Sequence, residues 1–102
     1  MILYSITLSV NPEVHDEWLK WVQTQFLPSV MLSGHFIEKR MLKLLNEELG
    51  QGITYSIQLI SPNMEILQEY VDTKEDLLEK PLRDQFGKHF VEFRTYLEVV
   101  EL

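Results

Sequence analysis

The chain has 102 residues, of which 45% are hydrophobic and 25% charged, and these are the proportions of a globular protein with one domain, residues 1–102. Sixteen acidic residues against nine basic ones give a net charge of −7, which disfavours binding to nucleic acid or to an anionic membrane surface. The absence of cysteine excludes disulfides, thiolate catalysis and cysteine-ligated metal centres.

The N-terminal residues alternate between apolar and polar types and have no basic segment, so they do not resemble a signal peptide. The unbroken apolar stretches are far shorter than the roughly 20 residues that cross a bilayer. We therefore expect a cytoplasmic protein that does not engage membranes.

The first third of the chain predicts a strand followed by a helix. Residues 2–10 alternate with a period of two, which indicates a half-buried strand. Asn11-Pro12-Glu13 then supplies the cap, the early proline and the acidic first turn of a helix. Pro28 should end or kink this helix at Leu27, with one further turn after it, and Gly34 should form a left-handed C-cap.

The middle of the chain predicts two strands. Residues 36–45 could also form a helix, but a strand is favoured because the Gly50-Gln51-Gly52 cluster follows and residues 53–60 alternate again. The loop Asn46–Gly52 between these segments is consistent with a hairpin.

The last third predicts a helical region and a strand. The helix starts at Ser61-Pro62-Asn63, and the spacing of Asp72 and Glu75 resembles a capping box that restarts it. Pro81 should kink this region or open a new first turn. Residues 89–101 alternate once more. The richer apolar face of that strand carries Val91, Phe93, Leu97 and Val99.

The resulting order β-α-β-β-α-β predicts an α+β, ferredoxin-like fold: a four-stranded antiparallel sheet with both helices on one face. The first and third strands should be central. They would place these apolar side chains beneath the helices: Ile2, Tyr4, Ile6, Leu8, Ile53, Tyr55, Ile57 and Leu59.

The other face of the sheet should carry small hydroxyl side chains in the middle and larger or charged ones towards its edges. We expect the last strand to add Phe90, Glu92, Arg94, Tyr96, Glu98 and Val100, and the second strand Glu38 and Arg40. One interpretation is a solvated sheet face. The other is a homodimer in which two sheets enclose a polar cavity that holds water or a small polar ligand. Its apolar rim would be Phe90, Tyr96, Phe36 and Leu3.

An aromatic cluster is the first candidate binding site. His15, Trp18 and Trp21 follow one another at three-residue steps on the first helix. With Tyr4 and Tyr55 they could wall a pocket for a flat ligand, with the histidine as an acid or base. The structural alternative is that Trp18 is core, Trp21 covers the sheet margin and His15 is exposed.

Two arginines are the second candidate. Arg40 and Arg94 lie in mid-strand and could each clamp a ligand carboxylate. The alternative is a cross-strand ion pair with Glu38, Glu92 or Glu98. The histidines lack the spacing of metal ligands, and the sequence has neither a Gly-x-Ser-x-Gly motif nor a Gly-rich phosphate loop. We therefore expect no metal site and no cofactor.

Several segments resemble a family of short bacterial proteins catalogued as a domain of unknown function and similar in topology to the dimeric α/β-barrel superfamily. The His-x-x-Trp-x-x-Trp helix at 15–21 is the most specific of them. The others are Met-Ile-Leu-Tyr-Ser-Ile-Thr at 1–7, Leu-Pro-x-Val-Met at 27–31, Gly-Ile-Thr-Tyr-Ser at 52–56 and Phe-Gly-Lys-x-Phe-Val-x-Phe-Arg-Thr at 86–95. The resemblance implies a ferredoxin-like fold and dimerisation, and no activity.

The functional expectation is a small cytoplasmic homodimer that binds a small molecule or serves an interaction role without catalysis. The alternative is a cofactor-independent monooxygenase- or isomerase-like enzyme of the dimeric α/β-barrel type, using the pocket around His15, Trp18, Trp21, Tyr4 and Tyr55. A third interpretation is a regulatory domain that partners a larger protein, which an exposed apolar patch left over after dimerisation would favour.

Overall fold

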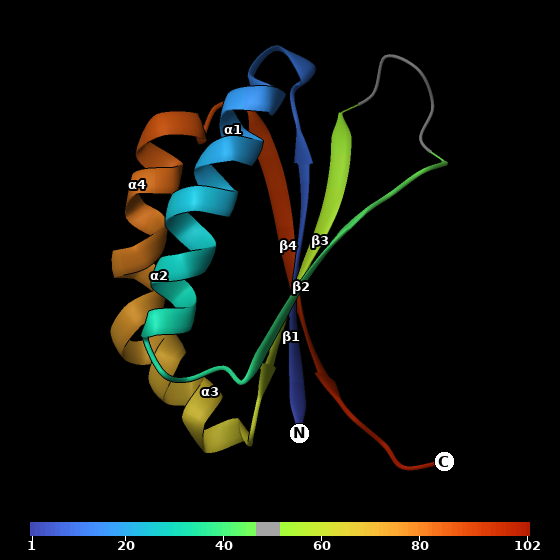
Figure 1. Ribbon diagram of the computed structural model, residues 1–102, viewed down its shortest axis with the longest axis vertical. Coiled ribbons are helices and arrows are strands. Elements are labelled where there is room, and N and C mark those ends of the chain that lie inside the picture. Colours follow the sequence, from blue (N-terminus) through green and yellow to red (C-terminus); the bar gives the residue numbers. More distant parts are fainter. Residues whose placement is uncertain (47–51) are drawn as a thin grey trace.

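The computed structural model describes residues 1–46 and 52–102 and has one sheet with helices packed along one of its faces (Figure 1). The strands are β1 (Ile2–Val10), β2 (Glu38–Lys43), β3 (Ile53–Ser61) and β4 (Phe90–Glu98). The first helical region comprises η1 (Pro12–Val14), α1 (His15–Trp21), η2 (Val22–Phe26) and α2 (Leu27–Leu32). The second comprises α3 (Met64–Tyr70), η3 (Val71–Glu75) and α4 (Asp76–Phe86).

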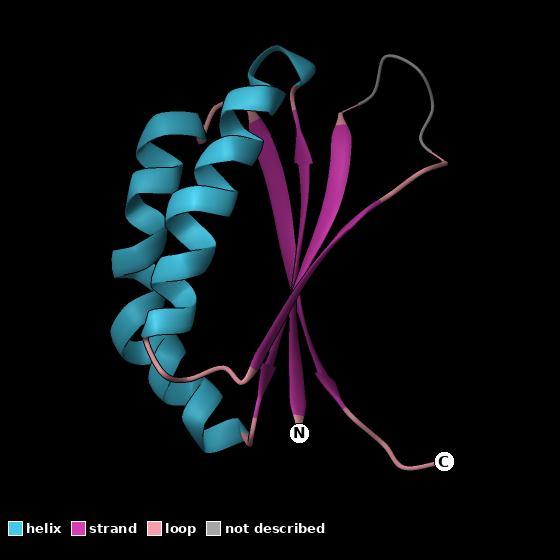
Figure 2. Cartoon of the chain, viewed as in Figure 1, coloured by secondary structure: helices cyan, strands magenta, loops and turns pink. Residues whose placement is uncertain are grey.

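The sheet has the strand order β2-β3-β1-β4, and every neighbouring pair is antiparallel. The first and third strands are central, as predicted, so the expected ferredoxin-like topology is confirmed. All helices lie on the same side of the sheet, and the opposite face is left open (Figure 2). In the described part of the chain, no helix is long and apolar enough to cross a membrane.

The core lies between the sheet and the helices. The alternation of β1 and β3 buries one side of each strand, with Ile6, Leu8, Ile57 and Leu59 at most 2% exposed. Ile2 and Ile53, at the strand ends, are only partly buried. The predicted core of the two central strands is therefore correct, because period-two alternation placed every second side chain under the helices.

The predicted helix starts and the hairpin are also present. The Asn11 side chain accepts a hydrogen bond from the Glu13 amide at 2.9 Å, and the Asn63 side chain accepts one from the Ile66 amide at 2.9 Å. Gly34 has a φ of +82°, the left-handed conformation expected of a helix C-cap. Strands β2 and β3 pair as expected; of the predicted loop Asn46–Gly52, residues 47–51 lie outside the described part.

The two prolines do not end their helical regions. Before Pro28 the helix widens into a π turn, in which the Leu27 amide donates to the Val22 carbonyl five residues earlier. This wider turn gives the proline ring room that an α-helical turn would not, so the helix continues through α2 to Leu32. Pro81 likewise lies inside α4.

The predicted capping box at Asp72 and Glu75 is wrong. Residues 71–75 form a second π turn, continuous with α3 and α4, and no side-chain cap restarts the helix there. The Glu75 side chain points inward and binds Tyr4 and Arg94. The carboxylate is used by the core, so it is not available to cap the backbone.

The prediction for the two faces of β4 is also wrong. Arg94 pairs with Ile6 of β1, whereas Phe93 pairs with Thr7. Because directly paired residues share a face, the even-numbered side chains of β4 lie under the helices and the odd-numbered ones lie on the open face. The alternation correctly predicted that β4 has two different faces. The expectation that its apolar face lies in the core was wrong. Val99 and Val100 lie beyond the end of the strand.

The expected rim of the open face changes accordingly. Phe36 is 5% exposed and belongs to the core, where its ring packs against Tyr70. Phe90 and Tyr96 lie on the covered side, so only Leu3 remains on the open face. The exposed apolar side chains of β4 take the place of the others.

Candidate functional site

A partly buried ionic cluster lies between β1, β4 and the second helical region. The Arg94 guanidinium donates to the Tyr4 hydroxyl at 2.6 Å and to Glu79 Oε2 at 2.8 Å, and it makes a second bond to Glu79. It also binds Glu75, which accepts a further hydrogen bond from Tyr4, and Glu92 at 3.0 Å. We call these five side chains the Arg94 cluster. One cation thus faces three carboxylates.

Burial sets the protonation behaviour of the Arg94 cluster. Glu79 is 2% exposed, and burial raises the pKa of its carboxyl group although hydrogen bonds and charge from Arg94 act in the opposite direction. Burial alone would lower the pKa of Arg94, but its hydrogen bonds and attraction to Glu79 outweigh burial and raise it. Arg94 therefore remains charged, and the Glu79 carboxyl group holds a proton more readily than it would in water.

Tyr4 belongs to the Arg94 cluster, and a second buried tyrosine, Tyr70, lies near its carboxylates. Burial raises the pKa of Tyr4, and its hydrogen bond to Glu75 adds to the effect. Burial also raises the pKa of Tyr70, with Glu79 contributing next. The Tyr70 hydroxyl is fully buried and has no hydrogen-bond partner among the described residues. Both phenols are neutral at physiological pH, so neither provides a tyrosinate for catalysis.

The aromatic candidates lie in three places, and Tyr4 is in the Arg94 cluster. His15 Nε2 lies 2.8 Å from the Tyr55 hydroxyl, and His15 Nδ1 lies 2.9 Å from an Asp16 carboxylate oxygen. The His15 and Tyr55 rings stack with centroids 5.6 Å apart, and Trp18 lies 5.3 Å from Tyr55. His15, Trp18 and Tyr55 are thus brought together. Trp21 lies elsewhere, against Phe26 and Phe86.

The group around His15 is packed rather than open. Trp18 is fully buried and Tyr55 is 7% exposed, and the His15 side chain is 13% exposed. Burial raises the pKa of Tyr55, and the charge of Asp16 adds to this effect. The imidazole and the phenol share a hydrogen bond, and a substrate would have to displace side chains that already contact each other.

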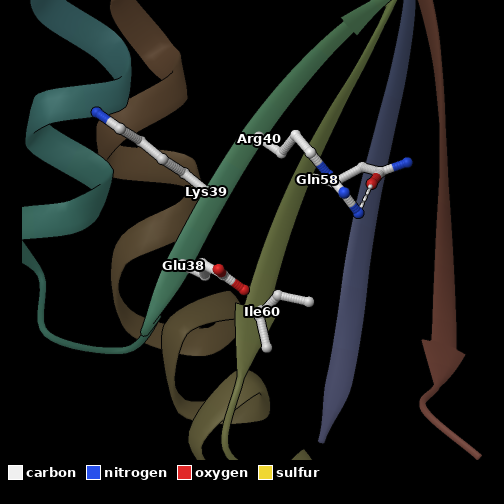
Figure 3. Close-up of a pocket in the computed structure, with 5 residues that line it drawn as sticks. All are labelled: Glu38, Lys39, Arg40, Gln58 and Ile60. Atoms are coloured by element: carbon white, nitrogen blue, oxygen red, sulfur yellow. Dashed lines mark hydrogen bonds between the residues drawn. The ribbon is translucent and has the colours of Figure 1, made fainter.

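On the open face, a chain of polar side chains crosses three strands. Ser5 and Ser56 share a hydrogen bond of 3.1 Å between β1 and β3. Gln58 donates to Ser56 at 3.4 Å, and Arg40 of β2 donates to Gln58 at 3.1 Å (Figure 3). Arg40 forms no ion pair within residues 1–46 and 52–102. The two arginines therefore differ: Arg94 is held by carboxylates, and Arg40 is held by an amide oxygen.

Two hollows lie along this polar chain. The first has a volume of about 100 Å³ and is formed around Arg40 and Gln58 (Figure 3). Its other lining residues are Glu38, Lys39 and Ile60. The Lys39 side chain extends away from Arg40 towards the helices (Figure 3). The second, of about 270 Å³, is lined by Thr7, Leu42, Lys43, Leu44, Thr54, Tyr55 and Ser56.

Exposed apolar side chains flank the polar chain. Val91, Phe93 and Leu97 of β4 are 72%, 64% and 48% exposed, and Leu42 of β2 is 43% exposed. With Leu3 of β1 they form what we call the apolar border of the open face. Apolar side chains gathered on a surface mark interaction sites, and the polar groups beside them can fix the orientation of a ligand.

Sequence reasoning missed Glu75 and Glu79 as inward-facing residues. The signal was present, because Glu75, Glu79, Leu82 and Phe86 follow one another at steps of four, three and four residues. Leu82 and Phe86 are buried, so the same helical face continues back through both carboxylates. A helix face that changes from apolar to acidic requires a buried cation opposite, and Arg94 is that cation.

Comparison with protein families gives a match over residues 1–100 to the family described as a domain of unknown function (DUF4286). The chain belongs to this family. No curated protein matches it.

Solved structures share the fold. A dimeric ferredoxin-like protein from an uncultured marine organism has a TM-score of 0.75 and 15% identity, covering 99% of this chain and 97% of its own. An antibiotic biosynthesis monooxygenase has a TM-score of 0.72 and 12% identity, with 99% and 100% covered. A protein of the ethyl tert-butyl ether d (ethd) family from Bacillus halodurans has a TM-score of 0.68 and 15% identity, with 98% and 100% covered. At these identities the likeness establishes the fold alone.

Proposed function

We propose that the chain is a homodimeric binding module: two open sheet faces meet, and the polar chain between them holds a small polar molecule without catalysis. The observation that carries this proposal is the apolar border, because large apolar side chains on a sheet face are stabilised when another surface covers them. A solved structure of the same fold is described as dimeric, which supports a second copy as the covering surface.

The size of the open face suits this role. In this sheet β1, β3 and β4 each have nine residues and β2 has six. Strands lie about 4.8 Å apart and rise about 3.3 Å per residue, so these four strands present a face of roughly 520 Å². Two such faces in full contact would remove on the order of 1,000 Å² from water, which is the lower size of a stable interface.

The ligand class follows from the side chains that would be enclosed. Ser5, Ser56 and Gln58 offer hydroxyl and amide groups, and Arg40 offers a guanidinium without a carboxylate partner among the described residues. These groups bind a small polar molecule through several hydrogen bonds, and a carboxylate on that molecule would suit Arg40. We place this function in the cytoplasm, with no nucleic acid or membrane partner, in keeping with the acidic, cysteine-free composition.

Catalysis is left out of the proposal because the candidate acid–base group is closed. His15, Trp18 and Tyr55 fill the space between helix and sheet with their own rings. One protein with the same fold is described as a monooxygenase, and for this reason the enzymatic alternative has its own test. Turnover of a small aromatic substrate by the wild type that is lost in His15→Ala would establish that alternative in place of the binding module.

The dimer is tested by light scattering during size-exclusion chromatography. Wild type should elute with about twice the chain mass of 12.1 kDa. Phe93→Glu should shift it to a single chain, because the substitution places two carboxylates in the apolar border of each dimer. The matched control is Leu77→Glu on α4, which is 66% exposed on the helical side and should leave the mass unchanged.

Native mass spectrometry of protein purified gently from cell extract tests the ligand. The dimer should carry an additional mass of a small molecule, and Phe93→Glu should lose that mass together with dimerisation. A dimer whose mass equals that of two bare chains in every preparation would contradict the binding role.

A further inference from the structure

We propose that Glu38 and Arg40 set the alignment of the two sheets by forming two reciprocal ion pairs, Glu38 of each protomer with the partner's Arg40. This inference rests on the proposed dimer and specifies the contact that determines its register. It assigns a partner to the two charged side chains of β2 that face away from the helices.

The first step is the uneven distribution of polarity across the open face. Its β4 edge carries Val91, Phe93 and Leu97, whereas its β2 edge carries the charged Glu38 and Arg40 beside a single apolar side chain, Leu42. In a twofold dimer the same patch contacts itself. If the axis ran along the strands, β4 of one sheet would cover β2 of the other and would bury charges against apolar side chains. An axis that crosses the strands places β4 over the partner's β4 and β2 over the partner's β2.

The second step is the position of the two charges on β2. Glu38 pairs with Ile60 and Arg40 with Gln58 of β3, so both side chains lie on the open face, two residues apart. An axis across the strands makes the two β2 strands run in opposite directions. When the axis passes near Lys39 on β2 and runs obliquely towards the middle of β4, Glu38 lies opposite the partner's Arg40, the exposed side chains of the two β4 strands still meet, and symmetry repeats the ionic contact. Opposite signs at this spacing make the strand complementary to itself.

The third step is that both charges lack an ionic partner in the single chain. Neither Glu38 nor Arg40 forms an ion pair within the described residues, and the Arg40 guanidinium is held only by the Gln58 amide oxygen (Figure 3). Covering this edge without compensation would leave charges poorly solvated, which is costly. The reciprocal pairs provide that compensation, and they disfavour any alignment that brings like charges together.

Charge reversal tests the pairing, with the dimer dissociation constant measured by sedimentation equilibrium. Glu38→Arg and Arg40→Glu should each weaken the dimer by about 10-fold or more, because each creates two like-charge contacts per dimer. The double variant E38R/R40E restores opposite charges and should return the constant to within about threefold of wild type. Circular dichroism checks that each variant remains folded.

The matched control is Glu65→Arg, which makes the same change in net charge at an exposed position in the first turn of α3 and should leave the constant unchanged. A double variant as weak as the single ones would overturn the pairing while leaving the dimer intact, as would single variants that dimerise like wild type. A wild type that stays a single chain at every concentration would instead overturn the proposed function itself.

Discussion

The two faces of the sheet differ in where their charged and apolar side chains lie. The covered face buries the Glu79 carboxylate and partly buries the Arg94 guanidinium, whereas the open face exposes the apolar border. Strand β4 contributes to both, with Arg94 on one side and Phe93 on the other. In most folded chains the charged side chains are exposed and the large apolar ones are buried.

The difference teaches that each face is explained by what lies against it. On the covered side, α4 supplies Glu79 opposite Arg94, so the buried charge is compensated within the chain. On the open side, no residue in the described part of the chain covers Val91 or Phe93. The covered face is complete in one protomer, and the open face becomes complete in the proposed dimer.

The largest expected effect tests the compensation on the covered face. Arg94→Met should lower the free energy of unfolding by about 3–5 kcal/mol, because it leaves the buried Glu79 without its cation. Urea denaturation followed by circular dichroism measures it.

Arg83→Met is the control for that substitution. Arg83 is 43% exposed and pairs with Asp76 at the surface of α4, so its loss should change the free energy of unfolding by at most about 1 kcal/mol. If both substitutions cost the same, the Arg94 cluster does not stabilise the fold in the way described.

A pair of leucines compares the two faces directly. Leu59 is fully buried beneath the helices, and Leu97 is 48% exposed on the open face. Leu59→Ala should cost about 2–5 kcal/mol of unfolding free energy at any protein concentration. Leu97→Ala should change the free energy of unfolding by at most about 0.5 kcal/mol in dilute solution. It should cost more at high concentration, where the dimer forms. A concentration-independent cost for Leu97→Ala would contradict the role of the open face.

The smallest expected effect concerns pH. Because the folded chain raises the pKa of Glu79 above its ordinary value of 4.5, the folded state holds that proton more tightly than the unfolded chain does. The resulting stabilisation is complete below the ordinary pKa and is lost as pH rises through the raised one. Glu79→Gln should remove this decline while keeping a hydrogen bond to Arg94. The excess stability of wild type over E79Q should therefore fall as pH rises, and an increase would contradict the account.

Much of the fold was predictable from the sequence because the central strands alternate cleanly. In β1 and β3 the side chains on one side are apolar and those on the other are mostly hydroxyl or amide, so only one orientation buries the apolar set. The caps at Asn11 and Asn63 were equally clear, because their side chains bond the first helical amides. These features depend on residues that lie close together in the sequence, so the sequence alone predicts them.

The faces of β4 and the Arg94 cluster were not predicted, because they depend on pairs of distant elements. Alternation shows that β4 has two faces but does not say which one meets the helices. That choice follows from α4, where Glu79 lies on the same helical face as Leu82 and Phe86. An arginine in mid-strand and a carboxylate on a buried helix face are each unusual, and together they indicate the covered side.

The most direct test of the central claim is hydroxyl-radical footprinting of wild type over a range of protein concentrations. The open face should be covered in the dimer, so modification of Phe93 should be strongly suppressed at high concentration and should rise on dilution. Leu77, exposed to a similar extent on α4, should be modified equally at every concentration. Phe93 modification that stays as constant as that of Leu77, in samples that light scattering shows to be dimeric, would contradict the claim that the two copies meet through this face.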